Sequence, residues 1–247
     1  MGNADGIAVE GGQKSGICLT FDDWFLRGWY GARDLFNQYD AKVTFFVGKP
    51  DAIKEKGWAK LRDLQSDGHE IGCHTMTHAR QTKFLSEHSF QDYITKEIVP
   101  ALKIMRENGM KVTSFAYPYF KYRPQLTGLL LDHFTMVREA GEQAIPVHAI
   151  YPAKGNVNVN VMGYLDRTGA DLPVSYYEER FSLLSKYGGF GVFCGHALGP
   201  DQPKYARMTC SYDDLEEVLA LARKHGLSMR PMRTIGFPKW GFRRALA

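Results

Sequence analysis

Short runs of strand-forming residues alternate with longer amphipathic stretches along nearly the whole chain, and this alternation limits the fold more than any other property. We expect strands over residues 16–21, 42–47, 69–73, 112–116, 144–151, 156–162, 190–194 and 228–233. We expect helices over residues 26–39, 52–66, 90–108, 125–132, 174–186 and 212–225, and we expect the helix over 90–108 to be broken at Pro100 or to begin again there. Such alternation predicts a parallel sheet with helices outside it. No glycine-rich phosphate loop follows the first strand, so an α/β barrel of about seven strands is favoured over an open dinucleotide-binding sheet.

Length and composition exclude several classes of protein. The chain has 247 residues, of which 44% are hydrophobic and 23% charged, values typical of one large globular α/β domain. No apolar run approaches the roughly 18 residues that span a bilayer, so we expect no transmembrane segment. The net charge is +4, but the basic residues are scattered among acidic ones, and we expect no nucleic-acid partner. The sequence carries no signal for an oligomeric state.

The ends and the cysteines add little to this view. Residues 1–14 are polar and glycine-rich, and we expect a flexible segment before a single domain that spans residues 15–247. This N-terminus has no apolar signal core, which indicates a cytoplasmic protein, or a secreted or cell-envelope protein if a signal peptide has been removed. The four cysteines form no CxxC pair, and we expect buried free thiols at positions 18, 73, 194 and 210.

Two adjacent carboxylates, Asp22 and Asp23, stand where the first strand is expected to end. Neighbouring side chains in a strand point to opposite faces, so both reach one site only if the chain leaves the strand between them. The alternative interpretation is a solvated pair that caps the following helix near Arg27.

Two histidines, His74 and His78, follow the third expected strand in the segment HTMTH. Histidines four residues apart lie on one side of a helical turn, so both imidazoles reach one ion there. Neutral imidazole suits zinc and similar divalent metals, and a carboxylate completes such a site. The alternative is a pair of hydrogen-bonded surface histidines.

Two further strand ends carry polar or aromatic residues. His196 follows the strand that ends at Cys194, and a lone histidine there is more often structural than catalytic. The segment Tyr117-Pro118-Tyr119 closes the strand before it, where the proline fixes a turn. A packed hydrophobic turn is the simplest interpretation of this segment taken alone.

The order of these motifs resembles that of the polysaccharide deacetylase family, which contains the NodB homology domain (carbohydrate esterase family 4). The resemblance extends from about Ser15 to about Gly236 and rests on TFDD, HTMTH, the proline–tyrosine turn and the late histidine. It implies a single domain with a distorted (β/α)7-type barrel. It also implies a divalent metal, usually zinc, and the removal of acetyl groups from amino sugars.

The resemblance implies a role for each matching residue. Asp22 aligns with the general base and His196 with the general acid. Tyr119 aligns with the aromatic residue whose backbone N–H helps to form the oxyanion hole. The three residues that align with metal ligands are Asp23, His74 and His78.

The chain departs from the family pattern at three places. Ala116 stands where the family has the arginine that pairs with the catalytic aspartate, and the candidates to replace it are Arg123, Arg138 and Arg167. Cys194 stands where an aliphatic residue is usual. The aspartate and tryptophan that support the histidine are not evident: Asp166 and Asp171 are candidates for the aspartate, and no tryptophan lies near either in sequence.

The sequence thus predicts a metal-dependent hydrolase that removes N-acetyl groups from chitooligosaccharide, peptidoglycan or a related glycan and releases acetate. For substrate binding we expect Trp24, Tyr117 and Tyr119, because sugars stack their C–H faces on aromatic rings. Phe120 and Tyr122 lie near the same edge, whereas Trp29 fits ordinary helix packing. Three alternatives remain: an O-acetyl xylan esterase, a hydrolase of non-sugar amides on the same fold, and a carbohydrate-binding barrel with little catalytic activity.

Overall fold

A computed structural model describes residues 15–121, 123–139, 157–159, 161–166, 172–200 and 207–234. The strands of these residues are β1 (Gly16–Asp23), β2 (Thr44–Val47), β3 (Glu70–Cys73), β4 (Ser114–Ala116), β5 (Met136–Arg138), β6 (Val157–Val159), β7 (Gly163–Tyr164), β8 (Phe190–Gly195), β9 (Ala197–Leu198), β10 (Thr209–Cys210) and β11 (Ser228–Met229). The α-helices are α1 (Leu26–Gly31), α2 (Arg33–Gln38), α3 (Glu55–Ser66), α4 (Gln81–Phe84), α5 (Phe90–Tyr93), α6 (Val99–Glu107), α7 (Pro124–Leu130), α8 (Val174–Tyr187) and α9 (Tyr212–Lys224). Residues 1–14, the expected strand 144–151 and residues 235–247 lie outside this description.

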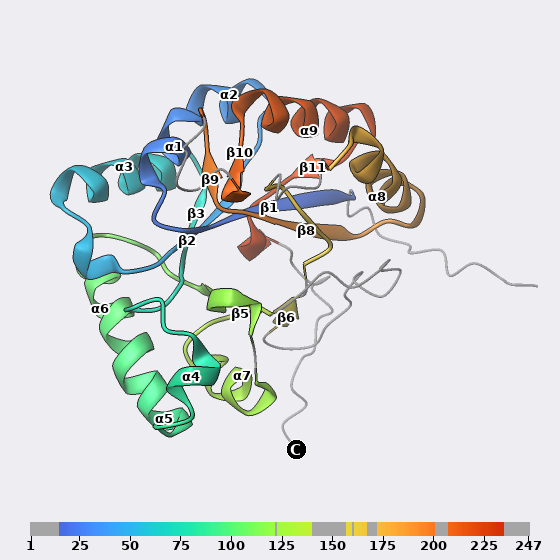
Figure 1. The fold of residues 1–247 in the computed structure, drawn as a ribbon. Coiled ribbons are helices and arrows are strands. Elements are labelled where there is room, and N and C mark those ends of the chain that lie inside the picture. The colour runs from blue at the N-terminus through green and yellow to red at the C-terminus, as the bar shows by residue number, and fades with distance from the viewer. Residues whose placement is uncertain are drawn as a thin grey trace, which may run out of the picture.

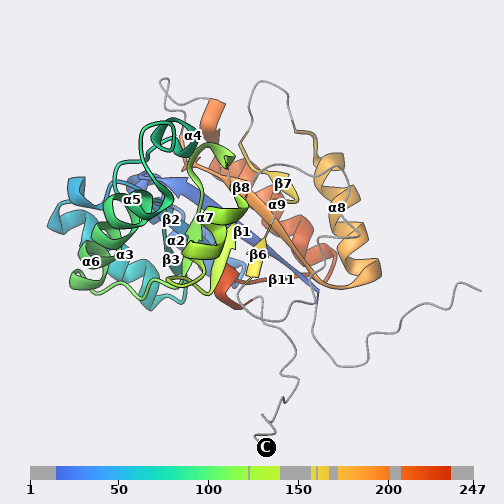
Figure 2. The ribbon, with the colours of Figure 1, turned by 90° about the horizontal axis from the view of Figure 1, so that it is seen from below.

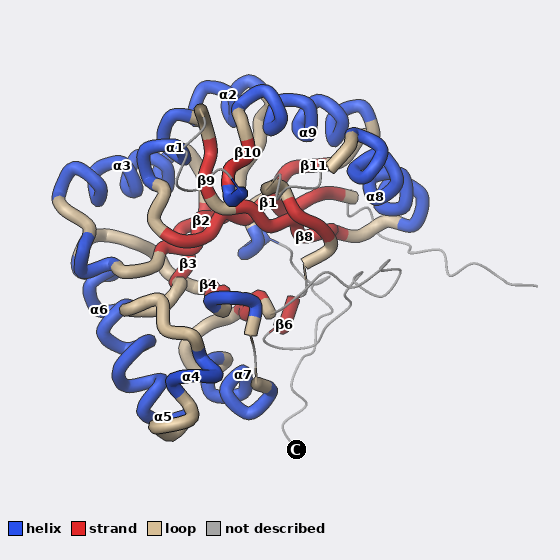
Figure 3. Tube along the Cα trace, in the orientation of Figure 1, coloured by secondary structure: helices blue, strands red, loops and turns tan. Residues whose placement is uncertain are grey.

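The main sheet is parallel and curls into an incomplete barrel. Its strands follow the order β6-β5-β4-β3-β2-β1-β8-β7, and β11 pairs with the start of β1. Figure 3 shows these strands running in an arc, with β5 and β6 across the interior from β1 and β8. In Figure 1, α1, α2, α9 and α8 lie along one side of the arc, and α4 to α7 lie around its other end. The view from below places α3 and α6 on the side opposite α8 (Figure 2). The expected α/β barrel in a single domain is therefore confirmed.

The two faces of the strands carry separate apolar clusters. Outward residues of β1 such as Leu19 and Phe21 pack under the helices in the larger cluster. The smaller cluster lies inside the barrel and consists of Cys18, Phe46, Ala116, Met136, Val159, Phe190, Val192 and Met232. Because strand side chains alternate with a period of two, Asp22 continues the inward row of Cys18 and Thr20. The same alternation directs Arg138 inward after Met136.

Most expected elements are present, but two expected helices are divided. The stretch 26–39 forms α1 and α2, which meet at Ala32. The stretch 90–108 contains a π-helical turn over Ile94–Ile98, between α5 and α6. Pro100 lies in the first turn of α6; a proline ring inside a regular helix would collide with the carbonyl of the preceding turn, and the wider π turn relieves this crowding.

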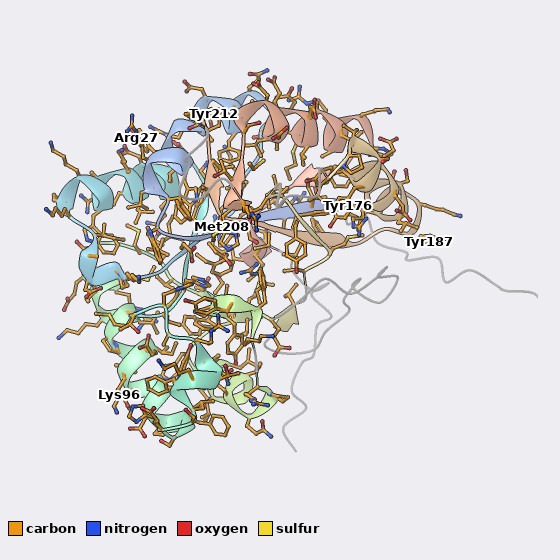
Figure 4. The ribbon with its side chains drawn as sticks, viewed as in Figure 1. Arg27, Lys96, Tyr176, Tyr187, Met208 and Tyr212 are labelled. Carbon is orange, nitrogen blue, oxygen red and sulfur yellow. The ribbon has the colours of Figure 1, made fainter. Side chains whose placement is uncertain are left out.

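Close packing of α1 against β9, which pairs with β10 in a separate two-stranded sheet, positions one side of the site. Gly28 approaches the β9 backbone so closely that a Cβ there would lie 2.0 Å from the Leu198 carbonyl oxygen. Tyr212, labelled in Figure 4, donates from its hydroxyl to the Gly28 carbonyl at 3.0 Å. These contacts bring Trp29 of α1 against the segment that follows β8. Among the described helices, none is both long and apolar enough to cross a membrane.

Candidate active site

The end of β1 brings two adjacent carboxylates to one site. Asp22 is buried and points into the barrel, beside Phe46 of β2 in the strand register. Asp23 would point outward in a regular strand, but its φ of 84° lies in the left-handed region and turns its side chain toward the strand ends. The chain therefore leaves the regular strand geometry at Asp23, and this allows both carboxylates to reach one site.

Asp23, His74 and His78 converge on one point. One ligand atom from each lies within 4.8 Å of the others. Asp23 Oδ1 lies 3.5 Å from His74 Nε2 and 3.0 Å from His78 Nε2. Burial alone would raise the pKa of Asp23, whereas imidazoles that donate to it would hold its pKa well below the usual range, and a cation at the same point would likewise favour the ionised carboxylate.

The surroundings of these atoms fit a divalent metal ion. His74 Nδ1 lies 2.8 Å from the Ala116 carbonyl oxygen, which only accepts, so Nδ1 carries the proton. In the neutral imidazole this leaves a lone pair on Nε2, directed at a carboxylate oxygen that is itself buried without a donor among the described residues. Two acceptors face each other across a gap, as ligands do around a cation, and the second hydrogen bond of His74 is typical of metal-binding histidines.

The loop that carries the two histidines is not the helical turn that the sequence predicts. Thr75 and His78 both have left-handed backbone, with φ of 71° and 59°. Glu97, in the π-helical turn, holds this loop by three hydrogen bonds. Its carbonyl accepts from Met76 N at 2.9 Å, and its carboxylate accepts from the Thr77 backbone and hydroxyl at 2.9 and 2.7 Å. Glu97 was missed because a lone glutamate inside a helical pattern carries no signal.

Arg138 supplies the basic partner that Ala116 lacks. Arg138 is fully buried, and its Nη2 donates to Asp22 Oδ2 in a short ion pair. In the parallel register of β4 and β5, Arg138 pairs with Ala116 itself. Burial alone would lower the pKa of Arg138, but Asp22 raises it, so the guanidinium stays charged. Of the other candidates, Arg123 is exposed at the start of α7 and Arg167 lies outside the described residues.

Cys194 completes the surroundings of Asp22. Its Sγ lies 3.6 Å from Asp22 Oδ2, and burial raises the pKa of this thiol well above its usual value. The protonated thiol therefore donates to the carboxylate, as an aliphatic side chain at this position would not.

His196 is held by an aspartate and a tryptophan. Asp166 Oδ2 lies 2.5 Å from His196 Nδ1, and Asp166 Oδ1 accepts from the His196 backbone at 2.9 Å. Trp29 Nε1 donates to the His196 carbonyl at 2.7 Å. Burial would lower the pKa of His196, but Asp166 raises it to about 9. The sequence offered Asp166 as one candidate; it missed Trp29, which lies far from His196 in the chain, and Asp171 lies outside the described residues.

Aromatic rings lie beside His78 and His196, but one of the aromatic residues expected to bind substrate lies elsewhere. The ring of Trp24 meets His78 edge-on at 5.4 Å, and the exposed ring of Tyr119 lies 4.7 Å from His78. Phe120 lies 6.5 Å from His196. Tyr117 is not brought to the site, because its ring packs on the outer face against Phe115 and its hydroxyl pairs with Thr127.

Several solved structures with this fold are described as deacetylases of polysaccharides. A chitin deacetylase from the fungal pathogen Colletotrichum lindemuthianum matches with a TM-score of 0.61 and 16% identity, over 92% of this chain and 89% of that one. A polysaccharide deacetylase from Bacillus cereus matches with a TM-score of 0.57 and 16% identity, over 91% and 96%. A peptidoglycan N-acetylglucosamine deacetylase domain from Eubacterium rectale gives 0.57 and 16%, over 95% and 94%. At these identities the likeness establishes the fold.

Sequence comparison identifies one curated relative and one family model. A curated gellan lyase from a Bacillus species is 32% identical over 115 residues, which are 46% of this chain and 4% of that far longer protein. The family model for polysaccharide deacetylase matches residues 10–133, half of the chain, a span that includes both aspartates, both histidines and Tyr119. The protein therefore belongs to the polysaccharide deacetylase family.

Proposed function

We propose that this chain is a metal-dependent hydrolase that removes N-acetyl groups from amino-sugar glycans and releases acetate. The observation that carries the proposal is that an arginine-paired aspartate, an Asp-His-His cluster and an aspartate-paired histidine meet at one end of the barrel. Each has a role in amide hydrolysis: a base for water, a site for a cation, and an acid for the leaving amine.

Asp22 is the proposed general base. Arg138 and Cys194 both contact Oδ2, which leaves Oδ1 without a hydrogen-bond partner among the described residues. A carboxylate with one oxygen held and the other free is oriented to take a proton from water as it attacks the acetyl carbonyl.

His196 is the proposed general acid. With its pKa raised to about 9, the imidazole is protonated at neutral pH and donates to the departing amine nitrogen. Asp166 fixes Nδ1, so the proton to be donated is on Nε2. The backbone N–H of Tyr119 is proposed to stabilise the oxyanion, an interaction typically worth about 3–4 kcal/mol in other hydrolases.

Asp23, His74 and His78 are proposed to hold the metal, and one carboxylate with two imidazoles suits Zn²⁺. When bound, the ion supplies Lewis-acid polarisation of the acetyl carbonyl and promotes ionisation of water.

The pairing of Arg138 with Asp22 bears on the alternative of a carbohydrate-binding barrel without catalytic competence. That alternative was motivated by Ala116, and the same ion pair is made from the adjacent strand. Two of the structural neighbours are variants of a carbohydrate esterase family 4 pseudoenzyme, one of them with restored activity, so competence needs a direct test.

The test is acetate release from N-acetylated chitooligosaccharide, peptidoglycan fragments and acetylated xylan, with metal content measured by elemental analysis. We expect release from an N-acetylated substrate, loss with a chelator and recovery when Zn²⁺ is returned. Asp22→Asn should abolish release, whereas Asp51→Asn, an exposed carboxylate outside the site, should leave it intact. Failure of the zinc-loaded protein to release acetate from all of these substrates would overturn the proposal, and release only from xylan would favour the esterase alternative.

A further inference from the structure

Two cationic side chains flank the metal-binding histidines, and neither is used in the chemistry proposed above. Lys49 follows β2, and its Nζ lies 4.1 Å from the centre of the Trp24 ring. Arg80 follows the histidine loop, and its guanidinium lies 4.5 Å from the centre of the Tyr119 ring. Trp24 and Tyr119 both contact the ring of His78. The result is a continuous rim in which one aromatic ring separates each cation from the same histidine.

The backbone at Lys49 holds that residue at the mouth of the site. Its φ of 51° is left-handed, and its N–H donates to the Thr75 carbonyl of the histidine loop at 3.2 Å. The preceding Gly48 donates to the Asp23 carbonyl at 2.8 Å. Lys49 is therefore tied to both segments that carry the candidate metal ligands.

The positive charge of this rim is not neutralised by its surroundings. Within the part of the chain that the structure describes, neither cation forms an ion pair, and Asp51 makes none with Lys49 two residues away. Deeper in the site, Asp22 pairs with Arg138 and Asp166 with His196, and Asp23 faces the two histidines as a candidate metal ligand. A divalent ion bound between the histidines would add positive charge to the same mouth.

We propose that the site selects glycans that carry carboxylates on sugars next to the acylated one. Each cation lies one aromatic ring beyond His78, so it meets a neighbouring part of the substrate rather than the acetyl group. Trp24 and Tyr119 provide aromatic surface for sugar rings. Lys49 and Arg80, each over one face of its ring, attract acidic substituents of the sugars. This inference rests on the proposed function and deepens it by naming the substrate class.

The test compares two substrates that differ only in charge. One is an oligosaccharide of alternating N-acetylglucosamine and glucuronic acid, and the other is its carboxyl methyl ester. With zinc-loaded protein we expect kcat/KM for acetate release to be about tenfold higher on the acid than on the ester at low salt, with most of that preference lost in 0.5 M NaCl. We expect Lys49→Gln and Arg80→Gln each to lower the preference about threefold, the size usual for an exposed charge contact.

Two matched variants isolate the effect of location. Lys60 lies over Tyr30 and Arg223 over Tyr39, so each also forms a cation–aromatic pair, but on helices away from the strand ends. Lys60→Gln and Arg223→Gln should preserve the preference for the acid. Equal kcat/KM on acid and ester, or equal effects of the rim variants and these controls, would overturn the inference while leaving deacetylation itself intact.

Absence of acetate release from any substrate would instead count against the proposed function, and a binding measurement then decides the inference alone. Calorimetric titration of the acidic oligosaccharide at low salt should show binding that the methyl ester lacks and that Lys49→Gln and Arg80→Gln weaken. Acid and ester that bind alike would refute it.

Discussion

Left-handed backbone gathers around the candidate site. Seven described residues other than glycine have positive φ, and six of them follow β1 to β4 at the strand ends: Asp23, Lys49, Thr75, His78, Tyr119 and Phe120. Each such residue costs roughly 1–2 kcal/mol, because its Cβ crowds the backbone. Strain of this kind persists where the surroundings enforce it, and here it turns carboxylate, imidazole and aromatic groups toward one point.

The pair formed by Arg138 and Asp22 yields a prediction at the level of single residues. Arg138→Lys keeps the charge but loses the planar guanidinium, and Arg138→Ala leaves a buried carboxylate unpaired at a stability cost of about 3–5 kcal/mol. We expect kcat/KM to fall at least about 100-fold in either variant. Adding Ala116→Arg to Arg138→Ala should restore part of it, because the two positions are register partners.

Circular dichroism would verify folding of these variants, and Arg123→Ala serves as a control because Arg123 is exposed. Wild-type kcat/KM in folded Arg138→Ala would contradict a role for Arg138 in orienting Asp22.

His196 yields a prediction about pH. The acid must be protonated to act, and Asp166 raises the pKa of His196 to about 9, so activity should hold through neutral pH and fall above about pH 9. Asp166→Asn removes the ionised partner, and burial then lowers the pKa of His196 instead. The alkaline limb of the kcat/KM profile should move to lower pH. If the limb stays in place in that variant, a group other than His196 titrates there.

At the scale of elements, the π-helical turn between α5 and α6 acts on the histidine loop through Glu97. Loss of a residue that holds metal ligands in place by hydrogen bonds commonly lowers metal affinity by about 10–100-fold. We therefore expect Glu97→Gln, which loses the charge that Thr77 bonds, to weaken zinc binding to the apoprotein by about tenfold.

Glu70 provides a matched control for this prediction, as a buried carboxylate at the start of β3 that bonds Thr44 and the Arg233 backbone. Glu70→Gln should leave the zinc affinity unchanged, although it also alters a buried carboxylate. Equal affinities in the Glu97 and Glu70 variants, measured by competition with a chromophoric chelator, would show that Glu97 serves stability alone.

Local sequence signals predicted where helices and strands lie better than they predicted breaks within a helix. Ser211 caps α9 by accepting from the Asp214 backbone, and Gly226 ends it with a φ of 68°, both as expected. The break at Ala32 was not foreseen, because a glycine such as Gly31 is tolerated inside a helical pattern. An interruption at Pro100 was expected, but not its form, a π-helical turn over Ile94–Ile98. The residues of the candidate site also fall into a group that the sequence predicted and a group that it did not. Asp22, Asp23, His74 and His78 lie within short motifs, whereas Arg138, Glu97 and Trp29 act across the fold and are spatial neighbours only.

At the scale of the whole molecule, His69 links folding to acidity. Its Nδ1 accepts from the Val43 backbone at 3.1 Å, and burial, with Lys42 nearby, lowers its pKa to about 4. The unfolded chain takes up a proton near pH 6.5 and the folded chain only near pH 4. The neutral imidazole therefore contributes stability above pH 6.5 that is lost as the pH falls toward 4.

The resulting change is at most about 3 kcal/mol in the free energy of unfolding. His69→Asn keeps an acceptor but does not titrate, so urea unfolding at pH 7 and pH 4 should give a smaller pH dependence than in the wild type. An unchanged dependence would assign the acid sensitivity to other groups.

The register partnership of Ala116 with Arg138 also bears on how such barrels diverge. Inward side chains of adjacent strands point toward the same barrel axis. An arginine at position 116 or at position 138 therefore places its guanidinium beside the same carboxylate, that of Asp22. An exchange of alanine and arginine between these two positions moves the arginine to the adjacent strand but leaves its positive charge in the same place. Among relatives of this chain we expect small residues at position 116 to accompany arginine at position 138. Motif searches that demand the arginine before the proline would discard chains that make the same ion pair.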